Sequence, residues 1–372
     1  MQRIEQIRRG AVPEGDKKKC GKVIPLTWDT SKMKEICIIN PLRPEVIPEK
    51  VVFLSMTDVS EDGKILHQQK VDYQSVKQGF TPFQKGDILV AKITPCFENG
   101  KGAHTERLVT DVGFGSTEFH VLRSKINSTY TFYHTVFENF RKKLEREMTG
   151  SAGQKRVQTA SLANYSIAVP PATEQQKIAA ILTTQDKVIE LKEKRLAEKQ
   201  RQKKYLMQQL LTGKKRLPGY WREWNFPKAK EVFQSVTDKN HKGDLMVLSA
   251  TQDKGIMPRD EVDIDIKYEV SSLASYKKVC QGNFVISLRS FQGGIEYSAY
   301  TGLVSPAYTV LSPKKELCDE YYKQYFKSAD FINRLNVAVY GIRDGKQISF
   351  EDFGRLRIPF PPINEQLSLI HI

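Results

Sequence analysis

The sequence repeats itself once, and this repeat constrains the fold more than any other feature. Six blocks of the first half recur in the same order in the second half, at offsets between 189 and 196 residues. The paired blocks are Ile24–Trp28 with Leu217–Trp221, Lys32–Ile36 with Lys228–Val232, Phe53–Thr57 with Val247–Thr251, Lys85–Val90 with Gln281–Ile286, Phe119–Leu122 with Tyr308–Leu311, and Ile167–Gln175 with Ile358–Gln366. Surface loops tolerate changes in length, which accounts for the drifting offset. We therefore predict a tandem duplication, with copies at residues 1–170 and 214–361.

The segments between the matched blocks differ in sequence between the two copies. A shared frame that carries different loops favours two modules that recognise different things.

The connector between the copies, residues 171–213, has the composition of one long helix. Residues 174–212 are rich in Glu, Lys, Gln, Leu and Ala and contain no Gly or Pro, and Gly213 provides a stop. At 1.5 Å per residue, such a helix is about 58 Å long.

Apolar residues recur along this helix with the seven-residue period of a coiled coil. The apolar members are Ile178, Leu182, Ile189, Leu196, Leu206 and Leu210, and Gln185, Lys192 and Lys199 interrupt one seam. A stripe of this kind needs a cover. Two interpretations remain open, which are a partner helix and the core of the helix's own domain.

The charge balance favours an anionic partner. Lys and Arg number 58 against 43 Asp and Glu, which gives a net charge of +15. Nucleic acid is the first candidate partner, and the alternative is a protein that is merely basic. The five cysteines are scattered, no apolar run is long enough to span a membrane, and the N-terminus lacks the apolar core of a signal peptide. These features predict a cytoplasmic protein.

Motifs for chemistry are missing from the sequence. There is no phosphate-binding G-x-x-x-x-G-K-S/T loop, no G-x-S-x-G elbow and no Cys/His spacing typical of a metal site. The Pro pairs at 170 and 361 lack the Asn or Asp and the aromatic residue that an amino-methyltransferase needs around a flipped base. We therefore predict no catalytic centre and no bound metal in this chain.

The two copies close on similar exits, IAVPPATEQQKI and IPFPPINEQLSL, and the connector ends YLMQQLLTGKKRLPGYW. This combination closely resembles the specificity subunit of type I restriction-modification enzymes. The resemblance covers nearly the whole chain and is most specific from Ile167 to Trp221. It implies an α+β fold with two target recognition domains, each reading one half of a split DNA target, joined by a long coiled-coil-type helix.

The resemblance also implies partners. Modification (M) subunits that hold S-adenosylmethionine and methylate adenine would assemble on the helices. A restriction (R) subunit would add translocation and cleavage driven by ATP with Mg²⁺. The specificity subunit itself would bind DNA and hold no cofactor.

The second copy departs from the family pattern at its end. Only six residues follow Gln366, whereas the first copy continues for 37 residues past Gln175 to Thr212. We expect residues 362–372 to be the start of a second spacer helix that is mostly missing. The central helix would then form an antiparallel homodimer or borrow a helix from a partner subunit.

Loops with cationic and amide side chains are the candidates for contact with DNA. The candidates in the first copy are Lys92, Asn99, Lys101, Lys155 and Arg156, and those in the second copy are Arg289, Gln292, Arg343 and Lys346. An ordinary hairpin with solvated polar residues is the alternative for each of them. A different function, that of a coiled-coil scaffold which binds no specific DNA sequence, also remains, although a scaffold has no need for two diverged sets of loops.

Overall fold

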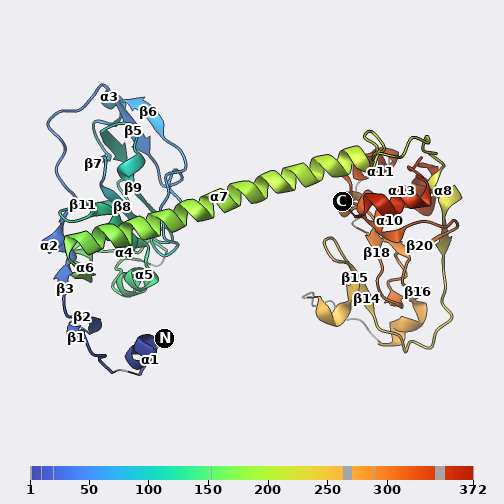
Figure 1. Ribbon diagram of the computed structural model, residues 1–372, viewed down its shortest axis with the longest axis horizontal. Helices are drawn as coiled ribbons and strands as arrows, with labels where there is room; N and C mark the ends of the chain where they lie inside the picture. The colour runs from blue at the N-terminus through green and yellow to red at the C-terminus, as the bar shows by residue number, and fades with distance from the viewer. Residues whose placement is uncertain are drawn as a thin grey trace. The chain divides into compact units, whose positions relative to one another are not determined.

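The computed structural model describes residues 2–9, 11–19, 21–151, 153–262, 270–288, 290–339 and 348–371. The chain forms two compact units, Met1–Leu191 and Lys192–Ile372, and each unit contains one copy of the repeat. Both units mix helices with short strands, so the predicted α+β class is confirmed (Figure 1).

The described residues of the first unit form four small sheets. Its strands are β1 (Asp16–Lys19), β2 (Lys22–Pro25), β3 (Asp29–Lys32), β4 (Cys37–Ile39), β5 (Lys50–Leu54), β6 (Gln69–Asp72), β7 (Thr81–Gln84), β8 (Ile88–Ala91), β9 (Gly102–His104), β10 (Val112–Gly115), β11 (Phe119–Ser124) and β12 (Ser166–Val169). Its helices are α1 (Gln2–Arg8), α2 (Met33–Ile36), α3 (Tyr73–Val76), η1 (Thr105–Arg107), α4 (Ser128–Val136), α5 (Glu138–Glu145), α6 (Thr159–Asn164) and the start of α7 (Ala172–Leu210).

The second unit has fewer and shorter strands. They are β13 (Phe233–Val236), β14 (Leu248–Thr251), β15 (Gly255–Pro258), β16 (Lys277–Val279), β17 (Phe284–Ile286), β18 (Glu296–Tyr297), β19 (Gly302–Val304) and β20 (Thr309–Pro313). The helices are α8 (Ala229–Val232), η2 (Arg259–Glu261), η3 (Val270–Ser275), α9 (Ser290–Gly293), α10 (Asp319–Tyr325), α11 (Ala329–Val339), α12 (Phe350–Arg355) and α13 (Ile363–Leu369).

Each copy is built on one four-stranded antiparallel sheet, which we call the frame sheet. The strand order is β4-β11-β8-β9 in the first copy and β13-β20-β17-β18 in the second. The equivalent strand partners are Cys37 with Ser124 and Phe233 with Pro313, and Ile88 with Leu122 and Phe284 with Leu311. These pairs differ by 196 and 189 residues, which are offsets found in the sequence repeat. The duplication is therefore present in the hydrogen-bond register.

Outside the frame sheet the copies diverge. The first copy has a second four-stranded sheet, β6-β5-β10-β7, in which β5 and β10 run parallel. The second copy has two separate strand pairs, β14-β15 and β16-β19. A single parallel bridge between Val247 and Leu303 takes the place of the parallel β5–β10 pairing.

Aromatic side chains fill the core beside the frame sheet of the second copy. Tyr321, Tyr322, Tyr325 and Phe326 of this core are each 0% exposed. Fully burying a large apolar side chain contributes about 1.5–3 kcal/mol, so this cluster stabilises the second unit independently of the first unit.

The helix α7 confirms the predicted central helix and begins and ends two residues earlier than expected. Figure 1 shows it as one unbroken helix. Gly213 follows it with φ +74°, a left-handed conformation that glycine adopts without strain, as predicted for the stop. No helix in the described part of the chain is both long and apolar enough to cross a bilayer.

Candidate nucleic-acid interface and helix anchors

Two loops of the first copy that the sequence singled out lie side by side. The Thr94 amide donates to the Lys155 carbonyl at 3.0 Å, and the Val157 amide donates to the Lys92 carbonyl at 2.9 Å. Arg156 is held on its other side by paired backbone hydrogen bonds with Thr149. The structure thus brings together three predicted residues, Lys92, Lys155 and Arg156, on a hydrogen-bonded backbone.

Two of these cations are held by fixed contacts, and the third is exposed. The Arg156 guanidinium donates to both carboxylate oxygens of Glu118, from Nε at 3.0 Å and from Nη2 at 2.8 Å, and this contact lowers the pKa of Glu118. Lys92 Nζ donates to the Thr117 carbonyl at 2.7 Å, and partial burial lowers its pKa. Lys155 is exposed. These four side chains carry a net positive charge, because Glu118 neutralises only one of the three cations.

The loop after Lys92 places the other two candidates differently. Asn99 is exposed at the loop, as a residue that contacts DNA must be. Lys101 turns inward instead, where Nζ donates to the Met56 carbonyl at 2.9 Å. Sequence reasoning missed Arg141, which donates to the carbonyls of Phe97 and Gly100, both at 2.7 Å. Burial lowers the pKa of Arg141 to about 10, and its two hydrogen bonds fix the loop from below.

The candidates of the second copy are placed only in part. Gln292 is exposed on the short helix α9. Arg289, Arg343 and Lys346 lie outside the described residues.

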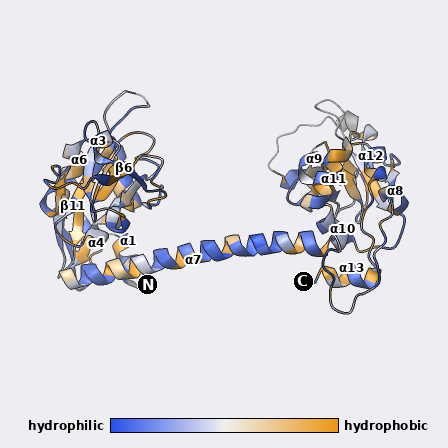
Figure 2. Cartoon of the chain, turned by 90° about the horizontal axis from the view of Figure 1, so that it is seen from above, coloured by the Kyte–Doolittle hydropathy of each residue, from blue (hydrophilic) through white to orange (hydrophobic). Residues whose placement is uncertain are grey.

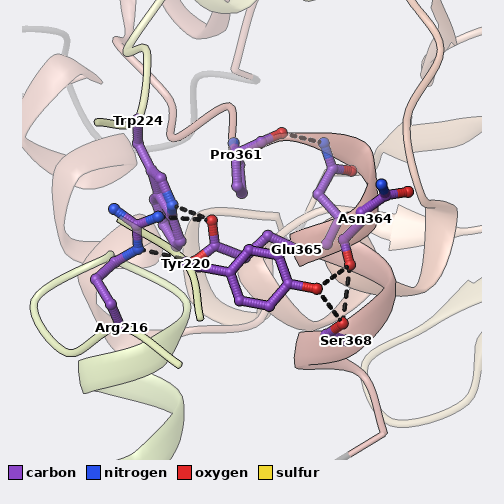
Figure 3. Close-up of polar contacts among 8 residues, drawn as sticks. Arg216, Tyr220, Trp224, Pro361, Asn364, Glu365 and Ser368 are labelled. Atoms are coloured by element: carbon purple, nitrogen blue, oxygen red, sulfur yellow. Dashed lines mark hydrogen bonds and ion pairs between the residues drawn. The ribbon is translucent and has the colours of Figure 1, made fainter. Parts of the chain in front are cut away.

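In each copy, a tryptophan donates a hydrogen bond to a glutamate of the helix that follows the copy in sequence. We call these two groups the anchors. In the first anchor Trp28 Nε1 donates to Glu174 at 2.9 Å, and in the second Trp224 Nε1 donates to Glu365 at 2.9 Å (Figure 3). The repeat alignment had matched Trp28 with Trp221. That match was wrong, because Trp221 is 83% exposed and Trp224 makes the equivalent contact.

The glutamine that follows each of these glutamates completes the anchor. Gln175 Nε2 donates to the Pro170 carbonyl and Gln366 Nε2 to the Pro361 carbonyl, both at 2.8 Å. The amide oxygen of each glutamine accepts a backbone N–H near the start of α4 or α10, from Asn127 and Cys318 respectively. Both buried side chains therefore bridge the Pro-Pro exit to the start of an earlier helix of the same copy, α4 or α10.

The second anchor has a cation that has no counterpart among the contacts of the first. Arg216 forms a bidentate ion pair with Glu365, from Nε and Nη2 at 2.7 Å each, and its guanidinium lies over the Trp224 ring (Figure 3). Tyr220 Oη contacts Ser368 Oγ at 2.7 Å on the next turn of α13.

The apolar stripe of α7 is covered at its two ends and exposed in its middle. Ile178 packs against the first core, whereas Leu206 and Leu210 belong to the second, with Leu210 only 8% exposed. Leu182, Ile189 and Leu196 are 37%, 49% and 60% exposed. The stripe is therefore covered by the core of its own unit at Ile178, Leu206 and Leu210, whereas an expected partner helix remains a prediction for the exposed middle. Figure 2 shows α7 as largely hydrophilic with isolated hydrophobic patches.

A hollow of about 670 Å³ lies beside the last turns of α7 within the second unit. It is lined by Leu206, Met207 and Leu210 of α7, by Gln324 of α10 and by the end of α13. Among the described residues, no three His, Cys, Asp or Glu side chains come together as a metal site.

Comparison with known proteins agrees with this architecture. Residues 25–200 match the family model for the type I restriction modification DNA specificity domain. The chain is 40% identical over 161 residues to the type I restriction enzyme EcoEI specificity subunit of Escherichia coli, and 35% identical over 188 residues to the EcoAI specificity subunit. These alignments cover 42% and 48% of this chain but only 27% and 32% of the two relatives.

Longer matches are more distant. The putative MjaX specificity subunit of Methanocaldococcus jannaschii is 22% identical over 93% of this chain and 86% of its own length. The HsdS subunit of Thermoanaerobacter tengcongensis has a TM-score of 0.54 at 19% identity, over 93% of this chain and 88% of that chain. A solved type I R-M system chain reaches a TM-score of 0.61, also at 19% identity, over 93% of this chain and 89% of its own. At this identity the structures show a shared fold.

Proposed function

We propose that the chain is a DNA specificity subunit of the type I restriction-modification family, whose model matches residues 25–200, and that it reads a two-part duplex DNA target. One observation carries the proposal. The two copies repeat the same frame-sheet register but differ in the loops around it. Two similar frames with different loops suit two half-sites with different sequences.

In the first copy, the half-buried Lys92 and Arg156 together with the exposed Asn99 and Lys155 are the proposed contact with DNA. Lysine and arginine position the protein on phosphates, and arginine and asparagine also read base edges. Gln292 is the described member of the corresponding surface in the second copy, with Arg289, Arg343 and Lys346 proposed to complete it. Lys101 is not part of this proposal, since it is held by Met56.

The chain supplies recognition, and partner subunits supply the chemistry. The M and R subunits of the system carry S-adenosylmethionine, ATP and Mg²⁺, and this chain binds none of them. We assign residues 1–170 and 214–361 to the recognition modules and residues 171–213 to the spacer. Residues 362–372, which include α13, are assigned to the beginning of a second spacer. With genomic DNA as its ligand, the protein is proposed to act in the cytoplasm.

Selection from random duplexes tests this function. The full chain, alone and with its M subunit, is expected to enrich sequences with two short fixed segments separated by an unspecified gap. If six to ten phosphates are contacted, affinity should fall about a thousandfold or more between 50 and 200 mM salt. Enrichment of one continuous site, or affinity that does not change with salt, would contradict the proposal.

The exposed middle of α7 is the proposed contact with a second helix. Leu182, Ile189 and Leu196 share one face, and burying them would favour association of two copies of the chain through an antiparallel pair. Changing the three residues together to Lys should leave a folded monomer. Sedimentation of the wild-type chain as a monomer at tens of micromolar would rule out the homodimer and leave the M subunit as the cover.

A further inference from the structure

We propose that Glu118 is a positioning residue of the first copy, which holds the Arg156 guanidinium where DNA will bind and releases it to DNA. This inference rests on the proposed DNA binding by the first copy. It adds a residue that the sequence did not single out, on the turn between β10 and β11.

The backbone around Arg156 holds this side chain in a defined place. Its amide and carbonyl are both paired with Thr149, at 2.8 and 3.1 Å, and the neighbouring Lys155 and Val157 are hydrogen-bonded to the Lys92 loop. Glu118 is equally fixed, because its carbonyl accepts the Lys92 amide at 2.8 Å. Glu118 and Arg156 therefore face each other from two hydrogen-bonded segments.

The pair is accessible to a ligand. The Arg156 side chain is 43% exposed and the Glu118 side chain 27% exposed. An ion pair of this exposure is screened by water and contributes little to folding, so its loss costs the fold little. The same guanidinium edge can bind two acceptors in a plane, and a phosphate or the O6 and N7 atoms of guanine present that geometry.

The second copy does not repeat this acid. The residue at the repeat offset of 189 from Glu118 is Ala307, two residues before the frame strand β20, whereas Glu118 directly precedes β11. The residue equivalent to Lys92 is Leu288, which is exposed. The cation-and-acid arrangement is thus a property of the first copy and not of the shared frame, as expected of a residue that serves one half-site.

Glu118 has two opposing effects on DNA binding. Its carboxylate competes with DNA acceptors for Arg156, which lowers affinity. It also keeps the guanidinium in one orientation. DNA acceptor pairs that match this orientation then bind better than acceptor pairs placed elsewhere. Removing the charge should therefore raise affinity and relax selectivity in one half of the target.

The test compares Glu118→Gln with Glu138→Gln in the full chain. Glu138 pairs with Lys142 on the exposed side of α5, so its substitution removes the same charge from a pair outside the proposed surface. We expect Glu118→Gln to raise duplex affinity about threefold to tenfold at low salt. The slope of log affinity against log salt concentration should become steeper by about one. Selection from random duplexes should show weaker base preference in a single half-site, and Glu138→Gln should change neither quantity.

Arg156→Ala separates positioning from simple charge repulsion. If Glu118 acts through Arg156, Glu118→Gln has no effect on affinity in the Arg156→Ala background. An unchanged effect in that background, or identical behaviour of the Glu118 and Glu138 variants, would overturn the inference while leaving the proposed function intact. A wild-type chain that binds no duplex would overturn both.

The Arg156→Ala variant by itself also identifies the acceptor. Loss of affinity in Arg156→Ala that is uniform across sequences assigns Arg156 to a phosphate, whereas loss confined to sequences with one particular base pair assigns it to a base edge. Both results agree with an exchange of Glu118 for DNA.

Discussion

The two copies differ least in backbone register and most in the polar groups placed on it. The turn before the central frame strand shows this clearly. Asp87 Oδ2 accepts the Gln84 amide at 2.7 Å in the first copy, and Asn283 Oδ1 accepts the Cys280 amide at 2.8 Å in the second. Asp87 also forms a bidentate pair with Arg123, whereas the second copy has Ser312 at the position of Arg123.

This comparison separates two roles of polar residues. Groups that close a turn or an exit are kept as the same type of hydrogen bond in both copies, since the backbone needs them. Among the described residues, the charged pairs Asp87 with Arg123, Glu118 with Arg156 and Glu365 with Arg216 have no equivalent pair in the other copy. Within the shared frame and its exits, the two copies therefore differ mainly in their charged pairs.

The largest expected effect comes from exchanging one copy. Replacing residues 1–170 with those of a relative that has a different target should change one half-site and leave the other unaltered. Each mismatched base pair costs about 1–3 kcal/mol, so the original half-site should lose several kcal/mol of binding free energy. Selection from random duplexes measures both halves at once. A simultaneous change in both half-sites would mean that the copies do not read DNA independently.

Much of the frame was predictable from the sequence, because it depends on local pattern and on the repeat. The offsets of 196 and 189 residues reproduce the strand register, and the composition of residues 174–212 predicted α7 to within two residues at each end. Gly213 was also identified correctly, since a left-handed stop has a local signature.

The anchors and the pairing of loop cations could not be predicted in the same way. Trp28 and Glu174 are 146 residues apart in sequence, so no local pattern joins them. The seven-residue period of α7 indicates that Leu210 packs against an apolar surface, but it does not indicate which one. In the structure this surface is the core of the second unit. Lys101 and Arg156 look alike in a loop sequence, although one binds a carbonyl inside the fold and the other a carboxylate at the surface.

The second prediction tests the difference between the two anchors. Glu365 is 0% exposed and pairs with both Arg216 and Trp224, so Glu365→Ala leaves a guanidinium and an indole N–H without their acceptor. We expect this change to cost about 3–5 kcal/mol of unfolding free energy. Glu174→Ala removes one hydrogen bond from Trp28 and should cost about 1 kcal/mol.

Denaturant unfolding followed by tryptophan fluorescence measures both anchor variants, because Trp28 and Trp224 report on different copies. Glu223→Ala, which changes an exposed acid next to Trp224, is the control and should be nearly neutral. Equal costs for the Glu174 and Glu365 variants would show that Arg216 does not strengthen the second anchor.

The third prediction concerns acid sensitivity, which should be concentrated in the first copy. Burial lowers the pKa of His120 to about 4, and the neutral ring accepts from Asn40 and donates to the Val157 carbonyl at 2.9 Å. Unfolding restores a pKa of about 6.5. Between pH 6.5 and 4 the unfolded chain therefore binds a proton that the folded chain excludes, and stability falls by about 3 kcal/mol as pH decreases.

Comparison of the wild type with His120→Gln isolates this contribution, because all other titrating groups are common to both chains. The difference in unfolding free energy between the two chains should change by about 3 kcal/mol over this pH range. A difference that is independent of pH would show that the folded chain protonates His120 as readily as the unfolded chain does. The second copy contains only His241 and offers no equivalent site.

The smallest expected effect comes from two glycines with the same backbone conformation in different surroundings. Gly79 in the first copy has φ +80° and open space where a Cβ would be, so Gly79→Ala should cost about 1 kcal/mol of conformational energy alone. At Gly213, φ is +74° and a Cβ would lie 2.8 Å from the Trp224 ring, whose indole N–H binds Glu365. Gly213→Ala must therefore add a shift of the second anchor to the conformational cost, and about 2–3 kcal/mol is expected. Denaturant unfolding measures both changes, and Trp224 fluorescence should respond to Gly213→Ala but not to Gly79→Ala. Equal costs with an unchanged Trp224 signal would mean that the indole has room to move and that the second anchor does not depend on the close approach of the chain at Gly213.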